Sequence, residues 1–186
     1  MISKRKLANP AAALILSGPP GSGKTTVARL LARRFDRAAH LESDVFFDFI
    51  QSGYLEPWKP EAHGQNRIVM RAVADAAVAY VTAGYFTIVE GIIIPGWFFE
   101  PLRDAIRGAD RDVAFAALRA PLDVCVSRAR GRCTRPLREE GVLARLWGDF
   151  ADLGSLEPHV IDVGRATPDE AVDLLAARLR ERSLTA

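Results

Sequence analysis

The chain has 186 residues, of which 49% are apolar, and its 25 basic and 23 acidic side chains leave a net charge of +2. This length and composition suit one compact domain, residues 1–186, and leave little room for a second. The charge is too small to make nucleic acid the main partner, and no stretch reaches the roughly 18 apolar residues that cross a bilayer.

The cysteine count and the first residues both bear on the cellular compartment. Cys125 and Cys133 have no metal-binding spacing and no secretory context, which indicates a reducing compartment. Lys4, Arg5 and Lys6 precede an apolar run that is short and ends in Gly-Pro-Pro, unlike the cleavage site of a signal peptide. We expect a cytoplasmic protein without a membrane partner.

Short apolar runs alternate with stretches of helical periodicity along the chain. Strands are predicted at 13–17, 38–41, 86–89, 113–118 and 160–163, and helices at 24–34, 45–51, 65–83, 101–107, 122–130, 137–150 and 168–182. Residues 53–64 are rich in proline and aromatic side chains and are predicted to form a loop. This alternation predicts the α/β class, with a parallel sheet that carries helices on both faces.

The last predicted helix has the clearest start signal. Thr167 stands at the cap position, Pro168 at the first helical position, and Glu170 three residues after the cap. This is the pattern of a capping box, in which the side chains of the cap and of the glutamate each accept a hydrogen bond from the other's backbone. The helix is therefore expected to begin at Pro168.

The most specific motif follows the first predicted strand. Residues 18–25 read GPPGSGKT, which fits the full G-x-x-x-x-G-K-[ST] pattern of a phosphate-binding loop between a strand and a helix. The backbone N–H groups of such a loop, together with the positive end of the next helix, bind phosphate oxygens. We expect the nucleotide to contact Gly18, Pro19, Pro20, Gly21, Ser22, Gly23, Lys24, Thr25 and Thr26.

Two side chains of this loop have expected chemical roles. Lys24 would reach the β and γ phosphates, and the Thr25 hydroxyl would bind Mg²⁺. A dinucleotide site is disfavoured because Lys24-Thr25-Thr26 stand where a third glycine would be needed. ATP and Mg²⁺ are therefore the expected cofactors.

An acidic residue follows the second predicted strand. Asp44 should emerge at the carboxyl edge of the sheet, which is also the edge of the phosphate loop. There it could accept the proton of an attacking hydroxyl or orient that hydroxyl, so it is predicted to be both catalytic and substrate-binding. The alternative is that Asp44 caps the helix predicted at 45–51.

A second carboxylate, Glu90, ends the third predicted strand and is followed by Gly91. Glu90 could hold Mg²⁺ through water, or it could face the substrate with Gly91 allowing close approach. A third interpretation is a solvent-facing acid at the end of a strand.

Five arginines follow the fourth predicted strand: Arg128, Arg130, Arg132, Arg135 and Arg138. One interpretation is a solvated basic helix end. The other is a lid that closes over the triphosphate and neutralises developing charge, with Arg128, Arg132 and Arg135 as the catalytic candidates. The planar arginine fork suits two-point contacts with phosphate.

Two further regions offer nucleotide and substrate contacts. The loop at Gly164 and Arg165 follows the last predicted strand and should lie near the phosphate loop. It could contact adenine, and it also serves as an ordinary connection from a strand to a helix. Trp58 and Trp97 offer apolar walls, and Asn66, with His63, Gln65 and Arg67, offers polar groups for a small-molecule pocket.

With these features in this order, residues 11–180 resemble the small P-loop kinases, which include adenylate, cytidylate, shikimate and gluconate kinases. The resemblance is nearest to the chloramphenicol-phosphotransferase-like and zeta-toxin-like branch, in which an aspartate after the second strand is implicated as the base. Asp44 occupies the matching position. The resemblance implies a five-stranded parallel sheet, an arginine-rich lid at about 128–140, ATP–Mg²⁺ as the donor, and Arg130 or Arg128 packed on the adenine.

The expected function is transfer of the γ-phosphate of ATP to a hydroxyl of a small metabolite or antibiotic, with the acceptor bound by residues 44–70. Alternatives are a nucleoside-monophosphate kinase such as cytidylate kinase, or a zeta-toxin-like kinase of a nucleotide sugar. A nucleotide-dependent switch or AAA-type ATPase is an alternative of another class, but Glu90-Gly91 replaces the Asp-Glu pair that such a motor needs. A monomer or a homodimer is expected.

Overall fold

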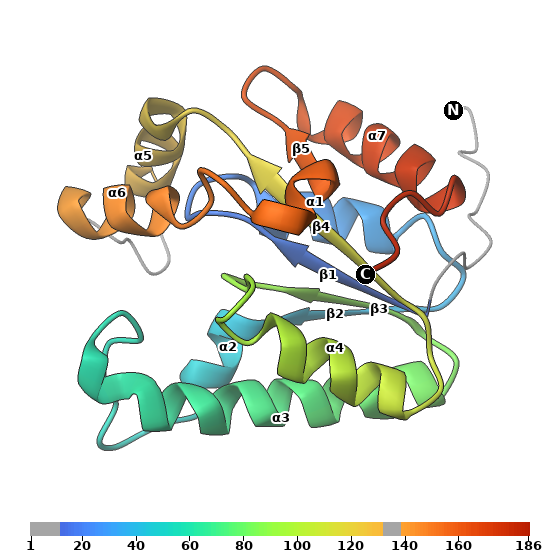
Figure 1. Cartoon of the computed structure of the whole chain (residues 1–186), viewed down its shortest axis with the longest axis horizontal. Helices are drawn as coiled ribbons and strands as arrows, with labels where there is room; N and C mark the ends of the chain where they lie inside the picture. Colours follow the sequence, from blue (N-terminus) through green and yellow to red (C-terminus); the bar gives the residue numbers. More distant parts are fainter. Residues whose placement is uncertain (1–11, 132–138) are drawn as a thin grey trace.

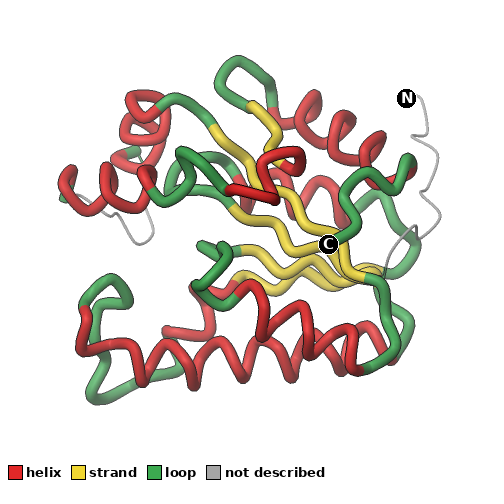
Figure 2. Tube along the Cα trace, in the orientation of Figure 1, coloured by secondary structure: helices red, strands yellow, loops and turns green. Residues whose placement is uncertain are grey.

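Five parallel strands form one central sheet in the computed structural model, which describes residues 12–131 and 139–186 (Figure 1 and Figure 2). The order across the sheet is β2-β3-β1-β4-β5. The strands are β1 Ala13–Ser17, β2 Ala38–Glu42, β3 Phe86–Glu90, β4 Val113–Arg119 and β5 Val160–Asp162. The predicted fold class is confirmed, because all four strand pairs are parallel.

Helices cover both faces of this sheet, as Figure 1 shows. They are α1 Lys24–Ala32, α2 Ser43–Phe47, α3 His63–Thr82, α4 Phe99–Gly108, α5 Leu122–Arg130, α6 Glu140–Gly148 and α7 Pro168–Arg180, with 3-10 turns at Pro60–Ala62 and Gly154–His159. No helix in the described ranges has the length and apolar character to cross a membrane.

The alternation of side chains along β1 divides the core into two layers. Leu14 and Leu16 pack with α1 and α7 on one face, whereas Ala13 and Ile15 pack with α3 and α4 on the other. All five residues of β1 are buried. A strand covered on both faces is a continuous apolar run, which explains why this strand was predicted with its observed bounds.

The predicted and observed helices differ mainly at their ends. The helix predicted at 45–51 is α2, which begins at Ser43 and ends at Phe47. The loop predicted at 53–64 contains the turn at Pro60–Ala62, and α3 begins within its last residues, at His63. The capping box of α7 is confirmed, since the Thr167 hydroxyl accepts from the Glu170 backbone and the Glu170 carboxylate accepts from the Thr167 backbone.

Candidate active site at the carboxyl edge of the sheet

The phosphate loop joins β1 to α1 and packs tightly against neighbouring backbone. Gly21 has φ +83, and a Cβ at this position would collide with the carbonyl oxygen of Cys125 on α5. Gly23 has φ +94 and lies directly before α1, with open space where a Cβ would stand. Both glycines therefore adopt a conformation that other residues rarely reach, and Gly21 also keeps the loop close to α5.

Lys24 begins α1 and is almost fully buried, at 6% exposure. Its ammonium group donates a hydrogen bond to the Pro19 carbonyl, 3.1 Å away, so the side chain folds back over the loop. The first turn of α1 carries no acidic residue. An anion at this loop would therefore meet the positive end of the helix and the lysine charge together.

Thr25 and Glu90 form a buried pair beside the loop. The Thr25 hydroxyl donates to Glu90 Oε1 at 2.6 Å, and Glu90 is only 3% exposed. The solvent-facing interpretation of Glu90 is therefore wrong. β3 lies between β2 and β1 in the sheet, and the side chain of Glu90, its last residue, is buried.

The electrostatic surroundings of Glu90 lower the pKa of its carboxyl. Burial by itself would raise the pKa of this carboxyl, but interactions with His40, Lys24 and Thr25 hold the pKa below its ordinary value. His40 Nε2 lies 3.8 Å from Glu90 Oε1. A threonine hydroxyl next to a charged carboxylate is a donor set that suits Mg²⁺, which favours oxygen ligands and one or two carboxylates together with substrate phosphates.

Asp44 lies in the first turn of α2, at the end of β2, and its side chain is exposed. The residue before α2 is Glu42, and no side chain caps this helix. The interpretation of Asp44 as the helix cap is therefore wrong, because α2 begins at Ser43, two residues earlier than that interpretation requires.

Gly91 brings the ends of β2 and β3 together. A Cβ at Gly91 would collide with the hydroxyl of Ser43, the first residue of α2. The buried Ser17 hydroxyl accepts from the Ile93 backbone at 3.0 Å, which ties the same segment to the end of β1. Gly91 thus sets the position of α2, and neither it nor Glu90 is among the residues that line the cavity described next.

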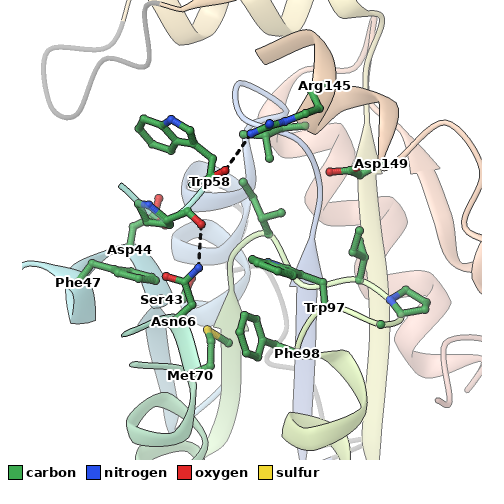
Figure 3. Close-up of a pocket in the computed structure, with 16 residues that line it drawn as sticks. Ser43, Asp44, Phe47, Trp58, Asn66, Met70, Trp97, Phe98, Arg145 and Asp149 are labelled. Atoms are coloured by element: carbon green, nitrogen blue, oxygen red, sulfur yellow. Dashed lines mark hydrogen bonds between the residues drawn. The ribbon is translucent and has the colours of Figure 1, made fainter. Parts of the chain in front are cut away.

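A cavity of about 380 Å³ opens beside Asp44 at the carboxyl edge of the sheet (Figure 3). Three of the predicted substrate residues line it: Asp44 from α2, Trp58 from the following loop and Asn66 from α3. Trp97, also predicted as an apolar wall, lies across the cavity in the segment between β3 and α4. Gln65 instead holds the backbone of Leu55 through two hydrogen bonds, of 2.8 and 2.7 Å.

Several lining residues were missed by sequence reasoning. Arg145 and Asp149 reach the cavity from α6 and its end, and Arg145 donates to the Trp58 carbonyl at 3.1 Å. Burial raises the pKa of Asp149, partly offset by Arg145. Their spacing of four residues on a predicted helix was the one available signal that they share a face.

The described part of the arginine segment is the end of α5. Arg128 and Arg130 are exposed in its last turn, whereas Arg132, Arg135 and Arg138 lie outside the described residues. Burial raises the pKa of the Cys125 thiol, and both Lys24 and Arg128 act against this rise. Arg128 and Lys24 therefore lie within electrostatic reach of the same buried thiol, where α5 meets the phosphate loop.

The loop after β5 returns to the same edge. A Cβ at Gly164 would lie 2.7 Å from Pro121, the residue before α5, and the Gly164 backbone donates to Asp162 at 2.8 Å. Arg165 is exposed. The loop at 164–165 thus packs against the segment that leads from β4 into α5.

Solved structures of two kinases and of a tunicamycin resistance protein share this fold. A sugar kinase from Janibacter sp. HTCC2649 matches with a TM-score of 0.63 and 24% identity, over 94% of this chain and 98% of that one. A gluconokinase from Sinorhizobium meliloti 1021 matches with a TM-score of 0.68 and 17% identity, over 95% of each chain. A tunicamycin resistance protein from Deinococcus radiodurans matches with a TM-score of 0.63 and 20% identity, over 90% of this chain and 94% of that one.

The amino-acid sequence matches a protein-family model. A search of curated protein sequences found no significant match. The family model described as "AAA domain" matches residues 14–151, which include the phosphate loop, Asp44, Glu90 and the cavity residues on α6. Because this match spans well over half of the sequence, the chain belongs to that AAA domain family of P-loop proteins.

Proposed function

We propose that the chain is an ATP- and Mg²⁺-dependent phosphotransferase that moves the γ-phosphate of ATP to a hydroxyl of a small molecule. The observation that carries this proposal is a cavity lined by Asp44 at the same sheet edge as a full phosphate-binding loop. The likeness to a sugar kinase and a gluconokinase supports a small molecule with a hydroxyl group as the acceptor.

On the donor side, the loop N–H groups and Lys24 bind the β and γ phosphates. Thr25 and Glu90 are the residues that would hold Mg²⁺, which neutralises charge on the transferring phosphoryl group when it is bound. Arg128, with Arg132 and Arg135, adds positive charge around that group, and Arg130, Gly164 and Arg165 contact the adenine.

On the acceptor side, Asp44 accepts the proton of the attacking hydroxyl or orients that hydroxyl toward the γ-phosphate. Trp58 and Asn66 hold the rest of the acceptor. The chain is proposed to act as a single domain in the cytoplasm, as a monomer or a homodimer, without nucleic acid as a partner.

The proposal is tested by ADP release from ATP and Mg²⁺ with a panel of hydroxylated acceptors. The panel includes sugars, hydroxy acids, amino alcohols, nucleoside monophosphates and nucleotide sugars. Stimulation by an acceptor that is lost in Lys24→Ala supports a kinase, and the acceptor itself separates a metabolite kinase from the nucleotide and nucleotide-sugar alternatives. Fast ATP hydrolysis that no acceptor changes would replace the proposal by an AAA-type ATPase.

A further inference from the structure

The cavity beside Asp44 has mostly aromatic and aliphatic walls. These come from α2, the loop at 57–58, α3, the segment after β3 and α6: Phe47, Pro57, Trp58, Met70, Ile92, Ile94, Pro95, Trp97, Phe98 and Leu146. In the described part of the chain, the charged lining residues are Asp44, Asp149 and Arg145. An acceptor with an apolar body fits such walls better than a fully hydroxylated sugar, because each hydroxyl that meets an apolar wall loses its hydrogen bond to water.

Asn66 lines this cavity and carries an unsatisfied, buried hydrogen-bond acceptor. Its side chain is 1% exposed, and its Nδ2 donates to the Pro57 carbonyl at 2.8 Å. Its Oδ1 has no hydrogen-bond partner among the described residues. A buried carbonyl oxygen without a partner costs free energy, so a ligand that brings an N–H or O–H donor to this oxygen is favoured.

Among residues 12–131 and 139–186, the charges that line the cavity favour a positive ligand. Two carboxylates, Asp44 and Asp149, face one guanidinium, Arg145, in the described lining. Arg145 already donates to the Trp58 carbonyl, so part of its donor capacity is used by the protein. A carboxylate or phosphate on the acceptor would meet like charge here, whereas an ammonium group would offset it.

The aromatic side chains add a second reason for a cation. Trp97 and Phe98 lie across the cavity from Asp44, and Trp58 and Phe47 line it on the side of Asp44 (Figure 3). Indole and phenyl faces attract ammonium groups through the ring quadrupole, most strongly where water is excluded. A neutral sugar or a hydroxy acid carries no positive charge and gains no such attraction.

We propose that the acceptor is a hydroxylated amine with an apolar body, whose ammonium group donates to Asn66 and lies between the aromatic rings and Asp149. Its hydroxyl then faces Asp44. This inference rests on the proposed phosphotransferase function and names the substrate class of the same site.

The proposal is tested with three ligands that share a phenyl ring and a hydroxyl but differ in charge. They are phenylalaninol, which is cationic, N-acetylphenylalaninol, which is neutral, and 3-phenyllactate, which is anionic. Binding is measured by calorimetry without nucleotide, and by the intrinsic tryptophan emission, to which Trp58, Trp97 and Trp147 contribute. We expect phenylalaninol to bind about tenfold more tightly than the neutral ligand, and 3-phenyllactate to bind at least about tenfold more weakly than the neutral one. Equal or tighter binding of the neutral or the anionic ligand overturns the proposal.

A variant assigns the charge preference to the cavity. In Asp149→Asn, the preference for phenylalaninol over N-acetylphenylalaninol should fall about three- to tenfold. The matched control is Asp123→Asn, which removes an exposed carboxylate from α5, outside the cavity, and should keep the wild-type preference. Loss of the preference in both variants, or in neither, contradicts a role of Asp149.

ADP release with the same ligands separates this proposal from the general function. Transfer to amino alcohols, with none to gluconate, glucose or shikimate, supports both. Transfer to gluconate or glucose without binding of phenylalaninol keeps the kinase and overturns the amine. Tight binding of phenylalaninol, with no acceptor giving ADP release above the water background, keeps the ligand class of the cavity and overturns the kinase.

Discussion

The donor side and the acceptor side of the candidate site differ in how far their polar groups are already satisfied by the protein. On the donor side, Lys24 donates to a loop carbonyl and Thr25 donates to Glu90. On the acceptor side, Asp44 is exposed and Asn66 has a buried oxygen without a described partner.

This difference indicates that the two sides of the candidate site have different structural requirements. A triphosphate is the same in every P-loop kinase, so its site can be held rigid by glycine contacts and internal hydrogen bonds. The proposed acceptor differs from one kinase to another. Its site in this chain is an open cavity, in which some polar groups have no described hydrogen-bond partner in the protein. Mutations on the two sides should therefore change different measurements.

The largest expected effect belongs to the acceptor side. Asp44→Asn removes the group proposed to accept or orient the attacking proton, and we expect kcat to fall about 10²- to 10⁴-fold. The affinity for ATP should stay within about a factor of two of wild type, because a mutation on the acceptor side has little effect on a separate binding site. Kinetics with the best acceptor and calorimetry with ATP measure the two quantities.

The control for this experiment is Asp48→Asn, which changes an exposed carboxylate at the end of α2 that does not line the cavity. It should leave kcat close to wild type. If Asp44→Asn transfers phosphate normally while ATP still binds, the role assigned to Asp44 is wrong.

The second prediction concerns the rigidity of the donor side. Gly21→Ala and Gly23→Ala both place a side chain at positive φ, but only the first drives a Cβ into the Cys125 carbonyl. Gly23→Ala should lower the free energy of unfolding by about 1 to 2 kcal/mol, and Gly21→Ala by about 1 to 3 kcal/mol more. Urea unfolding measures both. Equal losses would mean that the contact with α5 does not hold the loop.

The third prediction concerns metal binding. Glu90→Gln keeps the shape of the side chain but removes its charge, and we expect the apparent affinity for Mg²⁺ in ATP turnover to fall about 10- to 100-fold. Glu42→Gln is the matched control, because Glu42 pairs with Glu90 in the register of β2 and β3 but forms an ion pair with Arg29. An unchanged Mg²⁺ requirement in Glu90→Gln would exclude Glu90 from the metal site.

The donor side could be predicted from the sequence because its signals are local. The phosphate loop is a contiguous motif, and the strand before it is a central strand that is buried throughout and apolar except for Ser17. Glu90 was recognised as a strand-end carboxylate, but its contact with Thr25, 65 residues earlier in the chain, appears only when β3 pairs with β1.

The acceptor side was predicted only in part because distant segments build it. Asp44, Trp58 and Asn66 lie close in the chain and were expected to be near one another. Arg145 and Asp149 come from α6, and their approach to Trp58 depends on how α6 packs beyond the sheet edge. No periodicity in the sequence specifies that packing, so the charge of the cavity could not be inferred before the fold.

The smallest expected effect is the pH dependence of stability on the donor side. The pKa of Glu90 lies below its ordinary value in the folded chain, since His40, Lys24 and Thr25 outweigh the effect of burial. Its favourable interactions are therefore present at pH values above the unfolded pKa of the group, and they are lost as the pH falls through the lower folded pKa.

Wild type and Glu90→Gln should accordingly differ in how their free energies of unfolding respond to acid. The advantage of wild type over Glu90→Gln should be constant from about pH 7 to about pH 5 and then shrink as the pH falls below about 4.5. Urea unfolding of both proteins across this range measures it, with Glu42→Gln as the control for a partly exposed carboxylate. An advantage that grows on acidification would mean that burial dominates the pKa of Glu90, and the donor side would then lack the charged carboxylate on which the proposed metal site depends.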